Sequence, residues 1–255
     1  MSSDPGAGDA VSDASGFAST RAAWKAGAAD ALGVPAAVLT AGYVGFGALA
    51  SDAGFSLALT LFSTMTIWAL PGQIALIELR ALGTAAPALV LAVMLTSARF
   101  LPMAVTLLPL LRHPSYRPWH YYLAGHFVAM TGWAVAVRRC PALPVEQRLP
   151  YFLGFAIALW LACLVGTAAG HFASSSLTDL VTLGLVFLNP IYFILILGAE
   201  VRHRLGILSL LCGVLAGPLM HLVTPQWGLL VAGILGGTVA FAVNRLWSRL
   251  WRTKP

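Results

Sequence analysis

The sequence predicts an all-α membrane protein, a polytopic helix bundle of about eight spans with broken helices in spans two and six. The composition predicts the membrane class: hydrophobic residues make up 59% of the 255 residues, charged residues only 9%, and the mean hydropathy is +0.84. Soluble domains carry about 25% charged residues. This chain has too little polar surface to cover a globule in water, so we expect most of its surface to face lipid.

Eight apolar stretches are long enough to cross a bilayer, which takes about 20 apolar residues in a helix. Their ranges are 31–50, 55–77, 84–111, 119–137, 151–172, 177–199, 205–223 and 226–247. Backbone groups in lipid must pair within their own segment, so each stretch is expected to be helical. The longest linker, 138–150, carries three prolines and separates two four-helix halves. We predict a single transmembrane domain over 26–250, preceded by a disordered cytoplasmic tail at 1–25.

The basic residues predict the orientation of these spans. With a cytoplasmic N-terminus, twelve Lys and Arg residues lie inside, only Arg112 and Arg117 lie outside, and Arg99 lies in the membrane. This positive-inside bias favours an even number of spans with both termini cytoplasmic, in the inner (plasma) membrane of the cell. The alternative is a re-entrant second span, which would move the loop with Arg112 and Arg117 inside.

Span two is interrupted by Pro71 and Gly72, followed by Gln73. Proline removes a backbone donor and glycine loosens the backbone. The alternative is a kink in an otherwise ordinary helix, since both residues are frequent in membrane spans. Because Ser63 and two threonines lie one to two turns earlier, we favour a binding break, where freed amides and carbonyls face a cavity.

Span six carries Asn189 and Pro190 in its middle. An asparagine in a membrane helix needs a partner, and the proline frees a carbonyl one turn upstream. An interhelical hydrogen bond, worth about 1 kcal/mol or less, is the structural alternative to a place in a binding cavity.

Arg99 is the only formal charge between Thr84 and Leu111. Placing an arginine at the bilayer centre costs about 2.5–3.5 kcal/mol on insertion scales, and both ends of the span are too far for snorkelling. Its guanidinium either binds a substrate carboxylate in bidentate geometry or pairs with carbonyls freed at the two proline breaks. A buried ion pair is the third interpretation, with candidate carboxylates at span ends: Asp30, Asp52, Glu78, Asp179 and Glu200.

These features define one candidate site. The predicted substrate-binding residues are Ser63, Pro71, Gly72, Gln73, Ser97, Arg99 and Asn189. We expect no catalytic residues, metal or cofactor, because the sequence has no HExxH, no Walker A motif and no spaced cysteine pairs. The histidines His126 and His221 stand alone in apolar stretches and are interpreted as packing residues.

Two stretches resemble the AzlC family, the large subunit of two-component branched-chain amino acid exporters. The first, 34–79, contains the string GFGALA and then the break LPGQ; the second is LVLAVMLTSARFLPMAVTLLPLLR, 89–112, with Arg99 on the motif arginine. The likeness extends over roughly 30–200. It implies a transporter that works with a small AzlD-like hydrophobic membrane subunit, and a branched-chain substrate by analogy.

The function predicted on these grounds is secondary transport, as an exporter of small amino acids or related carboxylates. The partners expected are the AzlD-like subunit, the small-molecule substrate and the lipid bilayer, and no nucleic acid. The alternative is a membrane channel or an assembly subunit without amino acid transport. A channel normally shows polar stripes on several helices, whereas polar breaks here lie only in spans two, three and six.

Overall fold

The computed structural model describes residues 16–200, 204–223 and 228–252, and every regular element in these ranges is a helix. The predicted all-α class is therefore confirmed. Contacts along the chain divide it into two units, residues 1–189 and 190–255. The single domain predicted over 26–250 stays a prediction. Residues 1–15 of the predicted tail lie outside the described residues, and α1 begins at Thr20, inside the range predicted as tail.

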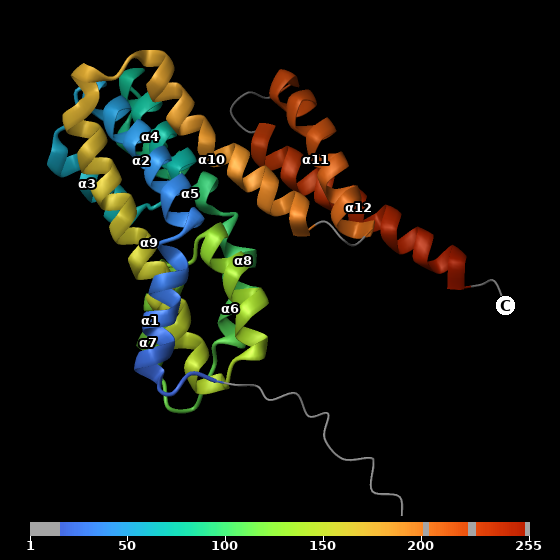
Figure 1. Cartoon of the computed structure of the whole chain (residues 1–255). Coiled ribbons are helices and arrows are strands. Elements are labelled where there is room, and N and C mark those ends of the chain that lie inside the picture. Colours follow the sequence, from blue (N-terminus) through green and yellow to red (C-terminus); the bar gives the residue numbers. More distant parts are fainter. Residues whose placement is uncertain (1–15, 201–203, 224–227, 253–255) are drawn as a thin grey trace, which may run out of the picture. The chain divides into compact units, whose positions relative to one another are not determined.

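In the first unit, α1 (Thr20–Ala31) and α2 (Val34–Asp52) follow one another almost without interruption, and α9 (Val145–Ala173) runs beside both (Figure 1). The Ser19 hydroxyl accepts the N–H of Ala22 and caps α1. Pro35 falls in the first turn of α2, where no helical donor is needed. By length and composition, α2 and α9 can each cross a membrane.

Glycines set the distance between α1 and α9. A methyl group on Gly27 would collide with the carbonyl of Tyr151, and a methyl group on Gly154 would collide with the carbonyl of Trp24. On α1, Gly27 lies three residues after Trp24, whose carbonyl meets Gly154. On α9, Gly154 lies three residues after Tyr151, whose carbonyl meets Gly27. Such reciprocal contacts are what a local twofold axis between two parallel helices produces.

The same reciprocity recurs between α2 and α9. Gly47 meets the carbonyl of Thr167, while Gly170 meets the carbonyl of Val44, again with three residues between glycine and carbonyl on each helix. In both places the backbones approach each other without an intervening side chain, which is the usual purpose of small residues in membrane helix interfaces.

The ends of α2 and α9 meet at a hydrogen bond between corresponding residues. The Ser174 hydroxyl donates to the Ser51 hydroxyl at 3.0 Å. The spacing of 123 residues that relates Gly47 to Gly170 also relates Ser51 to Ser174. The α1–α2 segment and α9 therefore behave as two copies of one element that run in the same direction.

The regions predicted as spans two, three and four each hold a pair of short helices. The pairs are α3 (Leu57–Thr66) with α4 (Leu70–Ala81), α5 (Ala86–Ser97) with α6 (Phe100–Leu110), and α7 (Pro118–His126) with α8 (Met130–Arg139). The two helices of the second pair are bent by 50°, and together they are apolar and long enough for one crossing. Short 3-10 turns, Cys140–Ala142 and Ser174–Ser176, flank α9.

The break in span two lies four residues before the predicted position, 71–73. Residues 67–69 leave the helix, whereas Pro71 falls in the first turn of α4, where its missing N–H costs no hydrogen bond. The sequence predicted a polar break in span three but broken helices only in spans two and six, and the break in span four was not predicted.

In span six, by contrast, α10 (Asp179–Glu200) runs as one helix with Pro190 inside, so the predicted break is not observed. Proline in a helix removes one hydrogen bond, here to the carbonyl of Val186, without necessarily ending the helix. In the second unit, α11 (Arg204–Val223) packs on α12 (Gly228–Arg252), where a methyl on Gly236 would lie 3.4 Å from the carbonyl of Cys212.

We predict that Gly170→Ala lowers the free energy of unfolding by about 1–3 kcal/mol, because the added methyl group forces α2 and α9 apart. The matched control is Gly184→Ala on α10, where a methyl group meets nothing within 4 Å. This control should be neutral or slightly stabilising, since alanine favours helices over glycine. Thermal unfolding in detergent, followed by tryptophan fluorescence, measures both. Equal melting temperatures for the two variants would contradict the packing described.

Candidate functional site

The three helix breaks adjoin one another in the first unit. Trp68, in the break between α3 and α4, packs edge-on against Phe127, in the break between α7 and α8, with ring centroids 6.1 Å apart. Nε2 of His126 donates to the carbonyl of Met65 at 3.1 Å, an acceptor that an unbroken α3 would have used itself. A side chain from the second break therefore satisfies a carbonyl that the first break leaves free.

Trp68 makes the turn of the first break. Its φ of +42° lies in the left-handed region, where non-glycine residues cost about 1–2 kcal/mol. The side chain is buried, packs on Phe127 and hydrogen-bonds to the thiol of Cys163 on α9. These tertiary contacts hold a conformation that the local sequence disfavours.

The third break, at Ala98 and Arg99, adjoins the start of α4. A methyl group on Gly72 would lie 2.9 Å from the Thr96 hydroxyl and 3.8 Å from the Ser97 hydroxyl. The first turn of α4 thus faces the last turn of α5, and the absence of a side chain at Gly72 permits that approach.

Gln73 lies at the centre of a buried hydrogen-bond network. Its Nε2 donates to Ser63 Oγ and Thr64 Oγ1, both at 3.0 Å, and its Oε1 accepts the Tyr43 hydroxyl at 3.2 Å. The Thr64 hydroxyl also lies 3.1 Å from the Thr167 hydroxyl. The network joins α2, α3, α4 and α9. Ser63 and Gln73 are therefore occupied by protein partners here, and their contact with a substrate stays a prediction.

Asn189 presents a buried acceptor near the start of α4. Its side chain is only 5% exposed, and its Oδ1 has no hydrogen-bond partner among the described residues. A methyl group on Gly42 would lie 3.1 Å from the Leu70 side chain and 3.4 Å from Asn189 Cβ. Asn189 and the α4 start therefore approach the same point of α2. The cavity predicted between Pro71–Gln73 and Asn189–Pro190 stays a prediction.

Arg99 lies at the junction of α5 and α6. Its guanidinium carbon is 5.2 Å from the centroid of the Phe100 ring, and it interacts electrostatically with Tyr43. The side chain is exposed on the first unit, and it forms no ion pair with any carboxylate in the described part of the chain.

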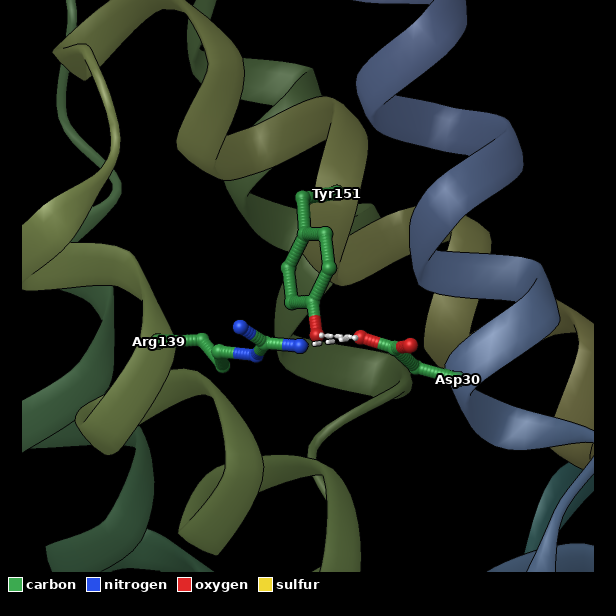
Figure 2. Close-up of polar contacts among 3 residues, drawn as sticks. All are labelled: Asp30, Arg139 and Tyr151. Carbon is green, nitrogen blue, oxygen red and sulfur yellow. Dashed lines mark hydrogen bonds and ion pairs between the residues drawn. The ribbon is translucent and has the colours of Figure 1, made fainter. Parts of the chain in front are cut away.

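One of the carboxylates considered for Arg99 is used elsewhere. Asp30 accepts the Tyr151 hydroxyl at 2.6 Å and pairs with Arg139 at 3.4 Å (Figure 2). These contacts join α1, α8 and α9 at one end of the first unit. This ion pair is partly solvent-exposed and serves to position helices rather than to balance the charge in span three.

The structure thus groups most of the predicted site residues. Ser63 and Gln73 share a network, Gly72 faces Ser97, and Pro71 belongs to the same turn as Gly72. Asn189 approaches the same point of α2 as the start of α4, and Arg99 follows Ser97 by two residues. Sequence reasoning missed Tyr43 and Trp68, because aromatic residues are common in membrane helices. No group of three or more His, Cys, Asp or Glu side chains in the described ranges could hold a metal.

We predict that Gln73→Leu lowers the free energy of unfolding by about 1–3 kcal/mol, because three buried hydroxyls lose a partner. The control is Thr66→Val, which removes an exposed hydroxyl bonded only to the carbonyl of Phe62 on its own helix. Chemical or thermal unfolding of both purified variants gives the comparison. A Gln73→Leu protein as stable as the control would show that the network contributes nothing to the fold.

Comparison with known families gives one match. The family model described as AzlC protein matches residues 36–177, more than half of the chain. No curated protein and no solved structure matches.

Proposed function

Because the chain belongs to the AzlC family, we propose that it is a secondary transporter that exports small amino acids of the branched-chain type. In this proposal it acts with a small AzlD-like hydrophobic subunit in the plasma membrane. The family supports a transport-related membrane function rather than an enzymatic one. The export direction, the branched-chain substrate and the AzlD-like partner are part of this proposal.

The observation that carries the proposal is the meeting of three helix breaks around buried polar groups. Secondary transporters bind substrates near the bilayer midplane with discontinuous helices, whose N-termini face anionic groups and whose freed carbonyls face cations. An amino acid carries both charges, so a site with amides, carbonyls and one guanidinium suits it. A passive assembly subunit would have no need of such an arrangement.

Within this site we assign the substrate carboxylate to Arg99. A guanidinium matches a carboxylate in a bidentate pair, and a mid-span charge without an internal carboxylate is unfavourable in lipid. The unpaired Oδ1 of Asn189 suits the substrate ammonium. In this assignment Ser63, Gln73 and Ser97 contact the remaining polar groups, and the backbone at Pro71 and Gly72 supplies free groups at the α4 start. Surrounding apolar side chains receive the aliphatic part.

We also propose eight spans with both termini cytoplasmic. The parallel course of α2 and α9 supports this, because an even number of crossings per half makes the first and fifth spans cross in the same direction. The positive-inside distribution of Lys and Arg supports the same orientation.

We predict that Arg99→Lys reduces transport more than tenfold, about 1.4 kcal/mol or more, because lysine keeps the charge but loses the bidentate fork. Arg99→Gln should abolish transport. The control is Arg80→Lys, an exposed arginine that lies over the Phe55 ring and should keep its activity. Counterflow of radiolabelled L-leucine in proteoliposomes containing both subunits measures the rates. If Arg99→Gln transports at the wild-type rate, Arg99 does not bind the substrate.

For the topology, a cysteine placed at the exposed Ala53 should react with an impermeant maleimide added outside intact cells. A cysteine at Lys254, which lies outside the described residues, should react only after permeabilisation. The native cysteines are replaced first; burial already raises the pKa of Cys140 to about 12, which keeps its thiol neutral and slow to react. Labelling of both positions from the same side would contradict the odd number of crossings proposed between Ala53 and Lys254.

A further inference from the structure

The first turn of α8 carries unused hydrogen-bond donors inside the protein. Ala129, just before it, is extended, and no side chain caps the helix. The first intrahelical bond runs from the N–H of Trp133 to the carbonyl of Ala129, at 2.8 Å. The N–H groups of the three residues 130–132 therefore have no helical acceptor. This turn is not at the surface, since Ala129 is 8% exposed and Thr131 is 1% exposed.

Two side chains at this break share the same lack of an acceptor. Thr131 Oγ1 and Trp160 Nε1 are both buried, and neither has a hydrogen-bond partner among the described residues. Thr131 belongs to the first turn itself. Trp160 lies on α9 and packs edge-on against Phe127, two residues before Ala129, with ring centroids 5.7 Å apart. Buried donors without acceptors are unfavourable, so each of these two groups requires an explanation.

The kind of ligand follows from the chemistry of these groups. Backbone N–H groups, a hydroxyl and an indole N–H can all donate, and residues 127–133 contain no acidic side chain to accept. The start of a helix also carries a partial positive charge. An anionic acceptor fits, and a carboxylate can accept several donors at once.

Resting on the amino acid transport proposed above, we propose that the first turn of α8, with Thr131 and Trp160, is a second carboxylate subsite of the transporter. It adjoins the α3–α4 break, because Phe127 contacts both Trp160 and Trp68. It is distinct from Arg99, which lies at the α5–α6 break.

The test compares two ligands on the purified full-length complex. L-leucine carries the carboxylate; L-leucinol keeps the ammonium and side chain but has a hydroxyl in its place. Thr131→Val removes one donor at nearly constant shape, whereas Trp160→Phe removes the indole N–H together with one of the two rings. Each should bind L-leucine about tenfold more weakly and L-leucinol unchanged, whereas Thr131→Ser should retain wild-type affinity for both.

The matched controls are Thr238→Val, whose hydroxyl bonds to the carbonyl of Ile234 on its own helix, and Trp119→Phe, which is exposed. Both should bind like wild type. The ligand-free melting temperature gives an independent reading: Thr131→Val, which removes an unsatisfied buried donor, should raise it or leave it unchanged, whereas the cavity left by Trp160→Phe should lower it. A Thr131→Val protein that is no less stable yet binds L-leucine more weakly supports the subsite.

The outcomes separate the two proposals. If the wild-type complex binds L-leucine and neither Thr131→Val nor Trp160→Phe weakens that binding, the α8 subsite is wrong and amino acid transport stands. Equal losses for L-leucine and L-leucinol also overturn the subsite, because the donors then do not contact the carboxylate. A wild-type complex that binds neither ligand overturns the proposed function and the subsite with it.

Discussion

The close backbone contact between α9 and the α1–α2 segment governs the arrangement of the first unit. Because glycine meets carbonyl at five places along this interface, the fifth being Gly166 against Thr40, the axial position of α9 is fixed to within a fraction of a turn. One face of α9 then meets the helix breaks in order: Trp160 reaches Phe127, Cys163 reaches Trp68, and Thr167 reaches Thr64. Substituting any of these glycines would displace the helix against which the breaks are assembled.

Breaking three helices within a membrane protein exposes amides and carbonyls that lipid cannot satisfy, so each must find a partner in protein or in water. The structure satisfies only some of them. Met65 receives His126, and Gln73 gathers the hydroxyls around it, whereas the starts of α4 and α8 have no side-chain cap. Selective satisfaction of this kind distinguishes a site that receives a polar ligand from a mere defect in a helix.

Composition and span length predicted the fold class, because both depend only on the solvent that surrounds the protein. The family was predicted from the sequence pattern between residues 34 and 112. The breaks were harder. Pro71 indicated a break in span two, but it lies in the first turn of α4, after the break. The breaks at 98–99 and 127–129 contain neither proline nor glycine and depend on tertiary contacts. The opposite error occurred at Pro190, where α10 continues. In the candidate site, polar residues near Pro71 were found, but Tyr43 and Thr131 gave no signal, since single residues of these types are unremarkable in an apolar run.

The glycine contacts between α2 and α9 have a mechanical consequence. Each contact joins a single glycine to a backbone carbonyl, so rotating either helix about its own axis would bring a larger side chain against the partner backbone and force the two axes apart. We therefore expect α2 and α9 to move as one rigid piece, with any rearrangement of the first unit confined to the helix breaks beside them.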